Sequence, residues 1–458
     1  MERYPATRRR SGSFEGGFGA ILLIDALALL LVVASGPAAY LYLNSSHPSP
    51  IIATAAPGAQ GSATPGPDAS HLAADSSAPG SPLANGSGAS ARPSPSLVYS
   101  DGSWTRTDPL PQARWASASV VLHDGRVMIV GGASGPSSQD AVASATIFDP
   151  STGRWGAATD MLQPRDYPMA VTLTDGSVLV AGGSRDGQPL DTAERYNPGN
   201  GSWVAAGRLN LPRSMGALTL LGDGRALVTG GGIEGGPGWG STASAEIFNP
   251  KTGIWSIAAP MAVARARQTA TLLVDGEVLV AGGATTYQGE TGSVTAAVEI
   301  YDPKSDSWRE AAPMSKPRYF HGATLLGDGR VLVAGGWYAT SNSDPSHATA
   351  EIYDPATDKW VATAPMTKAR AAYSLVGLPD GRVLAAGGVD PDYKAQASSE
   401  LFDPITGAWK ATGDLAQAVM WSAAEALPDG RVLVAGGGLD ASATHATAVC
   451  EIYSAPPR

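Results

Sequence analysis

Seven short, almost wholly apolar runs recur along the chain, and each is followed by two glycines. Val331-Leu332-Val333-Ala334 is one of them. Because such a run does not alternate apolar and polar residues, it predicts a strand covered on both faces. An Asp-Gly pair precedes every run, its aspartate seven residues before the first glycine, as at Asp124 and Gly125. Asp-Gly between apolar runs predicts a hairpin closed by a type I′ turn.

Two further strands complete each repeat. A third strand is predicted from Ala350-Glu351-Ile352-Tyr353 and its counterparts, which all end in Phe or Tyr. A fourth carries a tryptophan 27 residues before the first glycine of the next pair. The tryptophans are Trp104, Trp155, Trp203, Trp255, Trp308, Trp360 and Trp409. Four short strands about every fifty residues form a unit that cannot bury its faces alone, as in a β-propeller blade. We expect each indole to pack against the bare backbone of a glycine pair.

The combination of apolar strand, Gly-Gly, aromatic residue and Trp resembles the kelch repeat over roughly residues 99–456. The resemblance implies an all-β propeller with four antiparallel strands per blade. Trp104 precedes every glycine pair, whereas no tryptophan follows the last third strand at 449–453. The strand at about 102–108 should therefore complete the last blade with about 419–454. This closure predicts seven blades within 99–458 and removes exposed sheet edges.

The N-terminal part has a different composition. Residues 18–43 are apolar except for Asp25, and they follow a basic tail, 1–17. The length suffices to cross a bilayer, and the arginines predict a cytoplasmic N-terminus. We therefore expect a transmembrane signal-anchor helix with an extracytoplasmic propeller. The alternative is a signal peptide cleaved near residue 36, which would give a secreted protein. Residues 44–98, rich in Pro, Ser, Ala and Gly, predict a disordered linker.

Charge and cysteine content narrow the function classes. A net charge of −10 argues against nucleic acid as a partner, since phosphate binding favours a basic face. Cys450 is the only cysteine, so the chain forms no internal disulfide, and we expect this thiol to be buried. We expect the propeller to be monomeric.

One face of the propeller is the better candidate for binding. The Asp-Gly and Asp-Pro turns should share one face, and the more variable loops after Gly-Gly should share the other, where binding usually resides. An aromatic and acidic surface there suits a carbohydrate or a protein ligand, although exposed loops collect such residues in any case. The candidate ligand-binding residues are Trp239, Tyr287, Glu290, Trp337, Tyr338, Asp344, His347, Asp390, Asp392, Tyr393 and His445.

An arginine recurs 17 residues before Gly-Gly in six repeats, and Val419 takes its place in the seventh. These arginines could form a cationic ring at the channel mouth, in a region that kelch domains use for acidic peptides. We favour buried ion pairs with a glutamate that recurs on the third strand, where Thr146 is the exception. Pairing each arginine with the glutamate of the following blade places the two exceptions together. The predicted pairs are Arg114–Glu194, Arg165–Glu246, Arg213–Glu299, Arg265–Glu351, Arg318–Glu400 and Arg370–Glu451.

The kelch family also includes enzymes similar to galactose oxidase. Their copper centre needs two tyrosines, two histidines and a cysteine cross-linked to a tyrosine. Here Tyr319 and His321 are two residues apart, and Cys450 is the only thiol, so this ligand set is not recognisable. No other catalytic, phosphate-binding or metal-binding motif is legible, and no cofactor is predicted. We expect a membrane-tethered binding module, with a secreted kelch-type enzyme as the alternative.

Overall fold

The computed structural model describes residues 102–136, 140–233, 240–286, 294–338, 346–440 and 445–458. The predicted basic tail, membrane helix and linker lie outside these ranges. None of the described residues form a helix long and apolar enough to cross a membrane.

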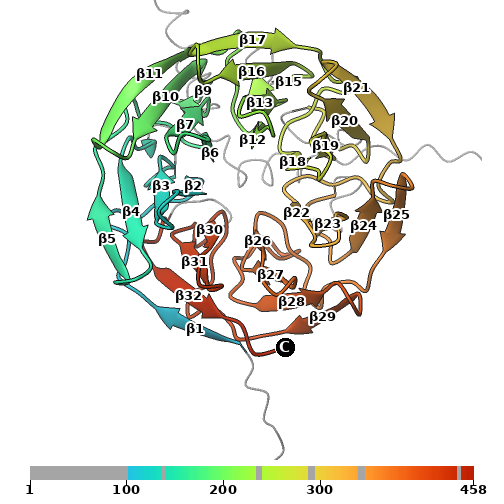
Figure 1. Ribbon diagram of the computed structural model, residues 1–458. Coiled ribbons are helices and arrows are strands. Elements are labelled where there is room, and N and C mark those ends of the chain that lie inside the picture. The colour runs from blue at the N-terminus through green and yellow to red at the C-terminus, as the bar shows by residue number, and fades with distance from the viewer. Residues whose placement is uncertain (1–101, 137–139, 234–239, 287–293, 339–345, 441–444) are drawn as a thin grey trace, which may run out of the picture.

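Seven four-stranded antiparallel sheets are arranged in a ring around a central axis (Figure 1), which confirms the predicted propeller. From the axis outward, the first four blades are β2 (Ala118–Val121), β3 (Val127–Val130), β4 (Ala145–Asp149), β5 (Arg154–Ala157); β6 (Met169–Thr172), β7 (Val178–Ala181), β10 (Thr192–Asn197), β11 (Ser202–Arg208); β12 (Ala217–Leu220), β13 (Ala226–Thr229), β16 (Ala245–Asn249), β17 (Ile254–Ala258); and β18 (Thr269–Leu272), β19 (Val278–Ala281), β20 (Val298–Asp302), β21 (Ser307–Ala311). The last three are β22 (Gly322–Leu325), β23 (Val331–Ala334), β24 (Ala350–Asp354), β25 (Lys359–Ala362); β26 (Ser374–Gly377), β27 (Val383–Ala386), β28 (Ser399–Asp403), β29 (Ala408–Ala411); and β30 (Ala423–Ala426), β31 (Val432–Ala435), β32 (Cys450–Ser454), β1 (Ser103–Arg106).

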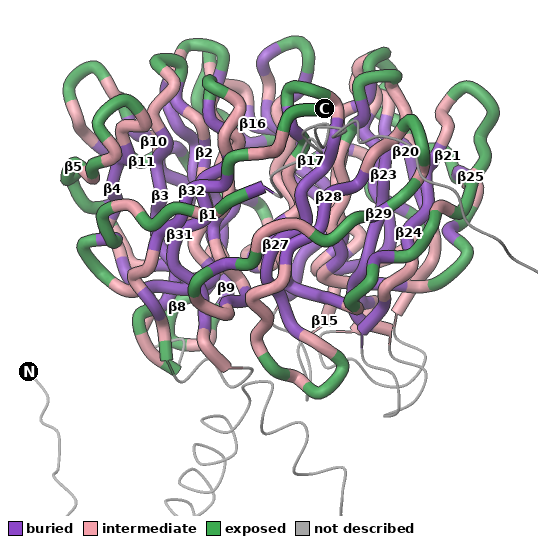
Figure 2. Tube along the Cα trace, turned by 90° about the horizontal axis from the view of Figure 1, so that it is seen from below, coloured by how far each residue is buried: buried purple, intermediate pink, exposed green. Residues whose placement is uncertain are grey.

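The ring closes as the sequence predicts. β1 pairs antiparallel with β32, with Trp104 opposite Tyr453, so the seventh blade combines both ends of the described chain. The Trp104 indole N–H donates to the carbonyl of Gly413 in the sixth blade at 2.8 Å. Two small hairpins, β8 (Ser184–Arg185) with β9 (Gln188–Pro189) and β14 (Gly232–Ile233) with β15 (Gly240–Ser241), add to the loops after Gly-Gly. β8, β9 and β15 project from the same face of the disc (Figure 2).

Apolar side chains fill the spaces between blades. The second strand is wholly buried in every blade, as the unbroken apolar runs predict. The recurring tryptophan lies on the outer strand, where it packs on the aromatic residue opposite it, as Trp308 does on Tyr301 at 5.0 Å. Its indole also donates across the blade boundary, here to the carbonyl of Ala259 at 2.7 Å. Six of the seven outer strands are thereby fastened to the preceding blade, whereas Trp409 Nε1 has no hydrogen-bond partner among the described residues.

Two local predictions are wrong. The Asp-Gly turns are not type I′, because the glycine has positive φ (83° at Gly125) whereas the aspartate does not. Gly125 N–H donates to Leu122 O and Leu122 N–H to Arg126 O, the pattern of a three-residue loop that ends in a glycine bulge. The second wrong prediction concerns the glycine pairs: main-chain atoms, and not an indole, pack against them. A Cβ on Gly335 would stand 2.5 Å from the carbonyl oxygen of Arg370 in the next blade.

Candidate functional site

The central channel opens on the face that carries the loops after Gly-Gly, and we call this opening the channel mouth. At this mouth, one backbone conformation recurs in every blade. In every blade, the residue two positions before the first residue of the innermost strand has a φ between 45° and 61°, although none of the seven is glycine. These residues are Ala116, Tyr167, Met215, Arg267, Phe320, Ala372 and Trp421, which we call the mouth ring. Bulky residues rarely adopt this conformation, and it persists only where the surroundings enforce it. Such strain clusters at functional sites.

Hydrogen bonds between blades enforce it. The N–H of a mouth-ring residue donates to the carbonyl of the mouth-ring residue in the preceding blade, at 2.8–3.2 Å, in six of the seven blades. The second glycine of each pair donates to the carbonyl of the residue two positions before the next blade's mouth-ring residue, as Gly336 does to Arg370 at 2.8 Å. The glycine pair thus has no side chain because the neighbouring main chain occupies that space. The backbone at the mouth is fixed, and the side chains on it vary.

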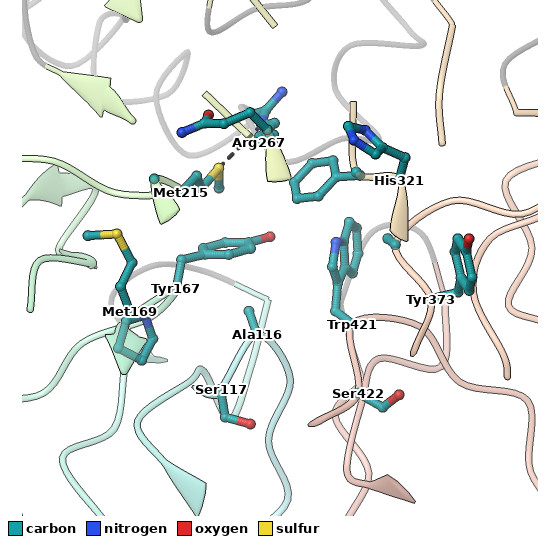
Figure 3. A pocket seen from close by; sticks show the side chains of 15 residues that line it. Ala116, Ser117, Tyr167, Met169, Met215, Arg267, His321, Tyr373, Trp421 and Ser422 are labelled. Atoms are coloured by element: carbon teal, nitrogen blue, oxygen red, sulfur yellow. Dashed lines mark hydrogen bonds between the residues drawn. The ribbon is translucent and has the colours of Figure 1, made fainter. Parts of the chain in front are cut away.

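A pocket of about 290 Å³ lies at this mouth, on the channel axis. Its lining comprises all seven mouth-ring residues, the residue that follows each of them, and Met169. Figure 3 shows Tyr167 and Trp421 directed toward each other across it. We call it the mouth pocket.

Aromatic rings dominate one side of the mouth pocket. Trp421 lies 5.5 Å from Trp115 and 6.3 Å from Phe320, between centroids. The mouth-ring residues on either side of Trp421 are alanines, Ala116 and Ala372, whereas Trp115 lies outside the mouth ring and packs near the indole. Aromatic and apolar walls beside polar groups are typical of ligand sites.

Polar side chains make up about half of the mouth pocket's lining. The Arg267 guanidinium lies over the rings of Phe320 and Tyr319, with its Cζ at 5.1 and 5.7 Å from the centroids. Burial lowers the pKa of His321 well below its usual range, so this imidazole is neutral. Gln268, buried like His321, donates through Nε2 to Thr229 O at 2.8 Å. Gln268 Oε1, His321 Nδ1 and Trp421 Nε1 are buried and have no hydrogen-bond partner among the described residues.

The repeated arginines do not form a cationic ring, because they are buried, with at most 1% of their surface exposed. Five pair with a glutamate, but the predicted partner is wrong by one blade. The observed pairs lie within one blade: Arg165–Glu194, Arg213–Glu246, Arg265–Glu299, Arg318–Glu351 and Arg370–Glu400, at 2.6–3.0 Å. The arginine precedes the inner strand, and its guanidinium also donates to the first glycine's carbonyl in the same blade, as Arg265 does to Gly282 at 3.0 Å. This contact holds the side chain within its own blade.

The exception in the first blade has a local cause. In six blades the glutamate accepts a backbone N–H three residues before the arginine position, as Glu299 does from Ala262 at 2.6 Å. In the first blade that position is Pro111, which has no N–H, and Thr146 replaces the glutamate. Glu451 keeps its backbone donor, Ala416, although Val419 stands in place of its arginine. Burial lowers the pKa of Arg114, which forms no ion pair among the described residues, to about 10.

The loop residues predicted from sequence divide into three groups. Trp239, Tyr287, Glu290 and Asp344 lie outside the described residues. Trp337, Tyr338, His347 and Tyr393 gather beside the mouth pocket, where Trp337 is 6.2 Å from Trp421 and 6.3 Å from Tyr393. His347 packs on Tyr338 at 5.0 Å, and burial lowers the pKa of His347 to about 4.

The remaining three do not line the mouth pocket. Asp390 accepts the Lys394 N–H at 2.8 Å and so holds its own turn, on which Asp392 lies. His445 contacts Asp440 at 3.0 Å in an exposed loop. The mouth ring was not identified from the sequence. In the sequence, each mouth-ring residue stands two positions after a repeated arginine, or after Val419 in the seventh blade. The position is fixed in every repeat, whereas the residue type at it varies.

The channel wall carries a single ionisable side chain. Of the seven innermost strands, only β30 has one, Glu425, which accepts a hydrogen bond from the Ser119 hydroxyl in the first blade at 2.9 Å. Burial raises the pKa of Glu425 to about 7. The folded protein therefore binds this proton more tightly than the unfolded chain does.

Replacing Glu425 with glutamine should raise the melting temperature at pH 8 and leave it nearly unchanged at pH 4.5. A raised pKa makes the stability contribution complete below about 4.5 and lost as pH rises toward 7, because the folded state must then hold a desolvated carboxylate. Thermal unfolding at both pH values measures the difference, with Glu310→Gln on exposed β21 as the matched control. An equal shift at both pH values would contradict the assignment.

No three His, Cys, Asp or Glu side chains within the described ranges lie close enough together to hold a metal ion. Cys450 is buried on β32, and burial raises the pKa of its thiol to about 12. This thiol packs in the core, as expected from the sequence.

Comparison with known proteins agrees with the repeat assignment. The family model described as Kelch motif matches residues 167–210, 216–262, 265–315 and 317–367. Kelch-like protein 23 of Pongo abelii is 29% identical over 130 residues, which are 28% of this chain and 22% of that protein. Kelch-like protein 40 of Mus musculus is 39% identical over 89 residues, 19% of this chain and 13% of that protein. The matches thus span less than a quarter of either relative.

Solved structures show the same fold at low identity. A fungal alcohol oxidase of the AA5 family in complex with copper superposes with a TM-score of 0.64 at 19% identity, covering 78% of this chain and 76% of its own. YjhT superposes with a TM-score of 0.53 at 18% identity, covering 67% of this chain and 99% of its own.

Proposed function

Because this chain carries kelch repeats folded into a seven-bladed β-propeller, we propose that it is an interaction module that binds a protein partner at the mouth pocket. The observation that carries the proposal is the mouth ring: seven similar backbone conformations that present six kinds of side chain. Variable side chains on a rigid scaffold are suited to recognition. The names of the matched relatives place them among kelch-like proteins, whose propellers generally bind proteins.

A random peptide library tests this function directly. Peptides selected on the full-length chain should lose at least tenfold in affinity when Trp421 is replaced by alanine, because the indole provides the largest apolar surface at the mouth. Ile405→Ala is the matched control, since Ile405 is 78% exposed in the turn between β28 and β29, on the opposite face. Peptides that bind wild type and Trp421→Ala equally would overturn the proposed site.

The membrane tether extends the same proposal. We propose that residues 18–43 anchor the chain and that the propeller lies outside the cytoplasm, on the basis of the apolar length and the preceding arginines. Added protease should then digest the propeller on intact cells, and the anchored chain should resist alkaline extraction. A mature chain that begins near residue 37 would instead support cleavage and secretion.

A further inference from the structure

We propose that the outer strand of the third blade, β17, is an interface at which two copies of this chain pair edge to edge. The proposal goes beyond binding at the mouth pocket, because β17 lies on the rim of the disc (Figure 1). It also differs from the expectation of a monomeric propeller.

The charges of the outer strands single out β17. Each outer strand is the free edge of its sheet, and an exposed edge pairs readily with a strand of another chain unless charged side chains, above all lysine, prevent it. β17, Ile-Trp-Ser-Ile-Ala, carries no ionisable side chain. The other six outer strands all carry an exposed arginine or lysine: Arg106, Arg154, Arg208, Arg309, Lys359 and Lys410.

Isoleucines take the place of these charges on β17. Ile254 stands directly before the repeated tryptophan, where Arg154 and Lys359 stand in the first and fifth blades, and it is 62% exposed. Ile257, two residues after that tryptophan, is 71% exposed. A partner strand that covered both side chains would be stabilised by their removal from water.

The exposed apolar surface extends onto the preceding blade. The Trp255 indole donates to Ala206 O of β11 at 2.9 Å, so the end of β11 packs against β17. Val204 on β11 is 55% exposed. The charge of Arg208 at the end of β11 is compensated by Asp191 at 2.7 Å, so this arginine adds no net charge to the rim.

A two-fold arrangement accounts for the missing charge. When a short strand pairs antiparallel with its own copy, each charged side chain lies close to its counterpart, and like charges opposite each other are destabilising. A strand of a different protein could carry the opposite charge, so pairing with it would not require an uncharged edge. β17 is the one described outer strand that can pair with itself without this repulsion, and two isoleucines from each copy would then meet in one ladder.

The charges that flank β17 complement each other in the same arrangement. Antiparallel pairing brings the start of β17 in one copy to the end of β17 in the other. Lys251 is exposed three residues before β17, and Asp306, also exposed, accepts the N–H of Ala259, directly after β17, at 2.9 Å. Lys251 of each copy would therefore approach Asp306 of the other, which favours this pairing.

Sedimentation equilibrium of the full-length chain in detergent tests the proposal. The wild type should form a dimer with a dissociation constant of about 10 µM, because a single strand pair gives a small interface. Ile254→Lys should weaken the dimer at least tenfold and should fold, since Lys359 occupies the equivalent position of β25. The matched control is Val361→Lys, a change at a 62% exposed residue of β25, and it should leave the dimer intact.

Each other result has a defined meaning. An Ile254→Lys chain that dimerises as tightly as the wild type would overturn the proposal, and so would a wild type that is monomeric at about ten times the expected dissociation constant. Hydrogen exchange then assigns the edge: protected β17 amides in that monomer would indicate another segment of the same chain, and unprotected ones a strand of a different protein. Ile257→Arg, which copies Arg106 of β1, is the second variant if Ile254→Lys does not fold. Peptides selected at the mouth pocket should bind Ile254→Lys and wild type equally, so the two proposals fail separately.

Discussion

Deletion of residues 102–108 should abolish the cooperative unfolding of the propeller or lower its stability by more than about 5 kcal/mol. The deletion removes all of β1, so β32 loses its four paired residues. It also removes Trp104, whose partly buried ring lies 5.1 Å from Tyr453; truncation of a fully buried tryptophan costs about 3–5 kcal/mol, and part of that is lost here. The contact with the first blade is lost as well, because the Trp155 indole donates to Asp108 O at 2.8 Å.

Differential scanning calorimetry of the full-length chain measures this effect. The matched control removes residues 80–86, an equal length of the predicted linker. The control should unfold like the wild type. A single transition at the wild-type temperature in the chain without 102–108 would show that β1 does not close the ring.

Replacing Glu299 with alanine should cost about 3–5 kcal/mol, because it leaves Arg265 buried without its carboxylate. In this blade the guanidinium donates otherwise only to main-chain carbonyls, and Glu299 also accepts the N–H groups of Ala262 and Val263. Arg265→Val should cost less than Glu299→Ala, because the glutamate keeps those two donors. That arrangement already exists in the seventh blade, where Glu451 accepts from Ala416 beside Val419.

Equilibrium unfolding in urea compares the variants. Thr146→Ala is the matched control at the equivalent position of the first blade, where the hydroxyl donates only to Gly156 O, and it should cost about 1 kcal/mol. A Glu299→Ala loss no larger than that of Thr146→Ala would mean that the ion pair contributes little. A larger loss for Arg265→Val than for Glu299→Ala would reverse the roles assigned to the two partners.

The sequence predicted the architecture well because its signals repeat. The spacing from Trp to Gly-Gly and the lone strand around Trp104 gave the number of blades and the closure, and β1 and β32 pair as expected. The local errors came from features that single motifs do not specify. Asp-Gly fits several hairpin loops, and only the φ of the aspartate distinguishes them. The glycine pairs were expected to receive the repeated tryptophan, whereas a carbonyl of the next blade occupies that space.

The ion pairs and the site show a further limit. Two exceptions, Val419 and Thr146, matched each other under the wrong offset only by coincidence. Thr146 goes with Pro111 in its own blade, and Glu451 keeps a backbone donor in the blade of Val419. Loop composition drew attention to Trp337, Tyr338 and Tyr393, which lie beside the mouth pocket. The lining itself comes from residues just ahead of the inner strands. Their importance depends on a backbone conformation that composition does not report.

The hydrogen-bonded backbone of the mouth ring has a consequence for how such a protein can change. Main-chain groups of neighbouring blades hold these seven positions, so exchanging a side chain there leaves the scaffold's supports in place. Gene duplication and drift could therefore redirect such a receptor toward new targets through a handful of codons. Randomising these seven codons would give a compact library for engineering affinity reagents.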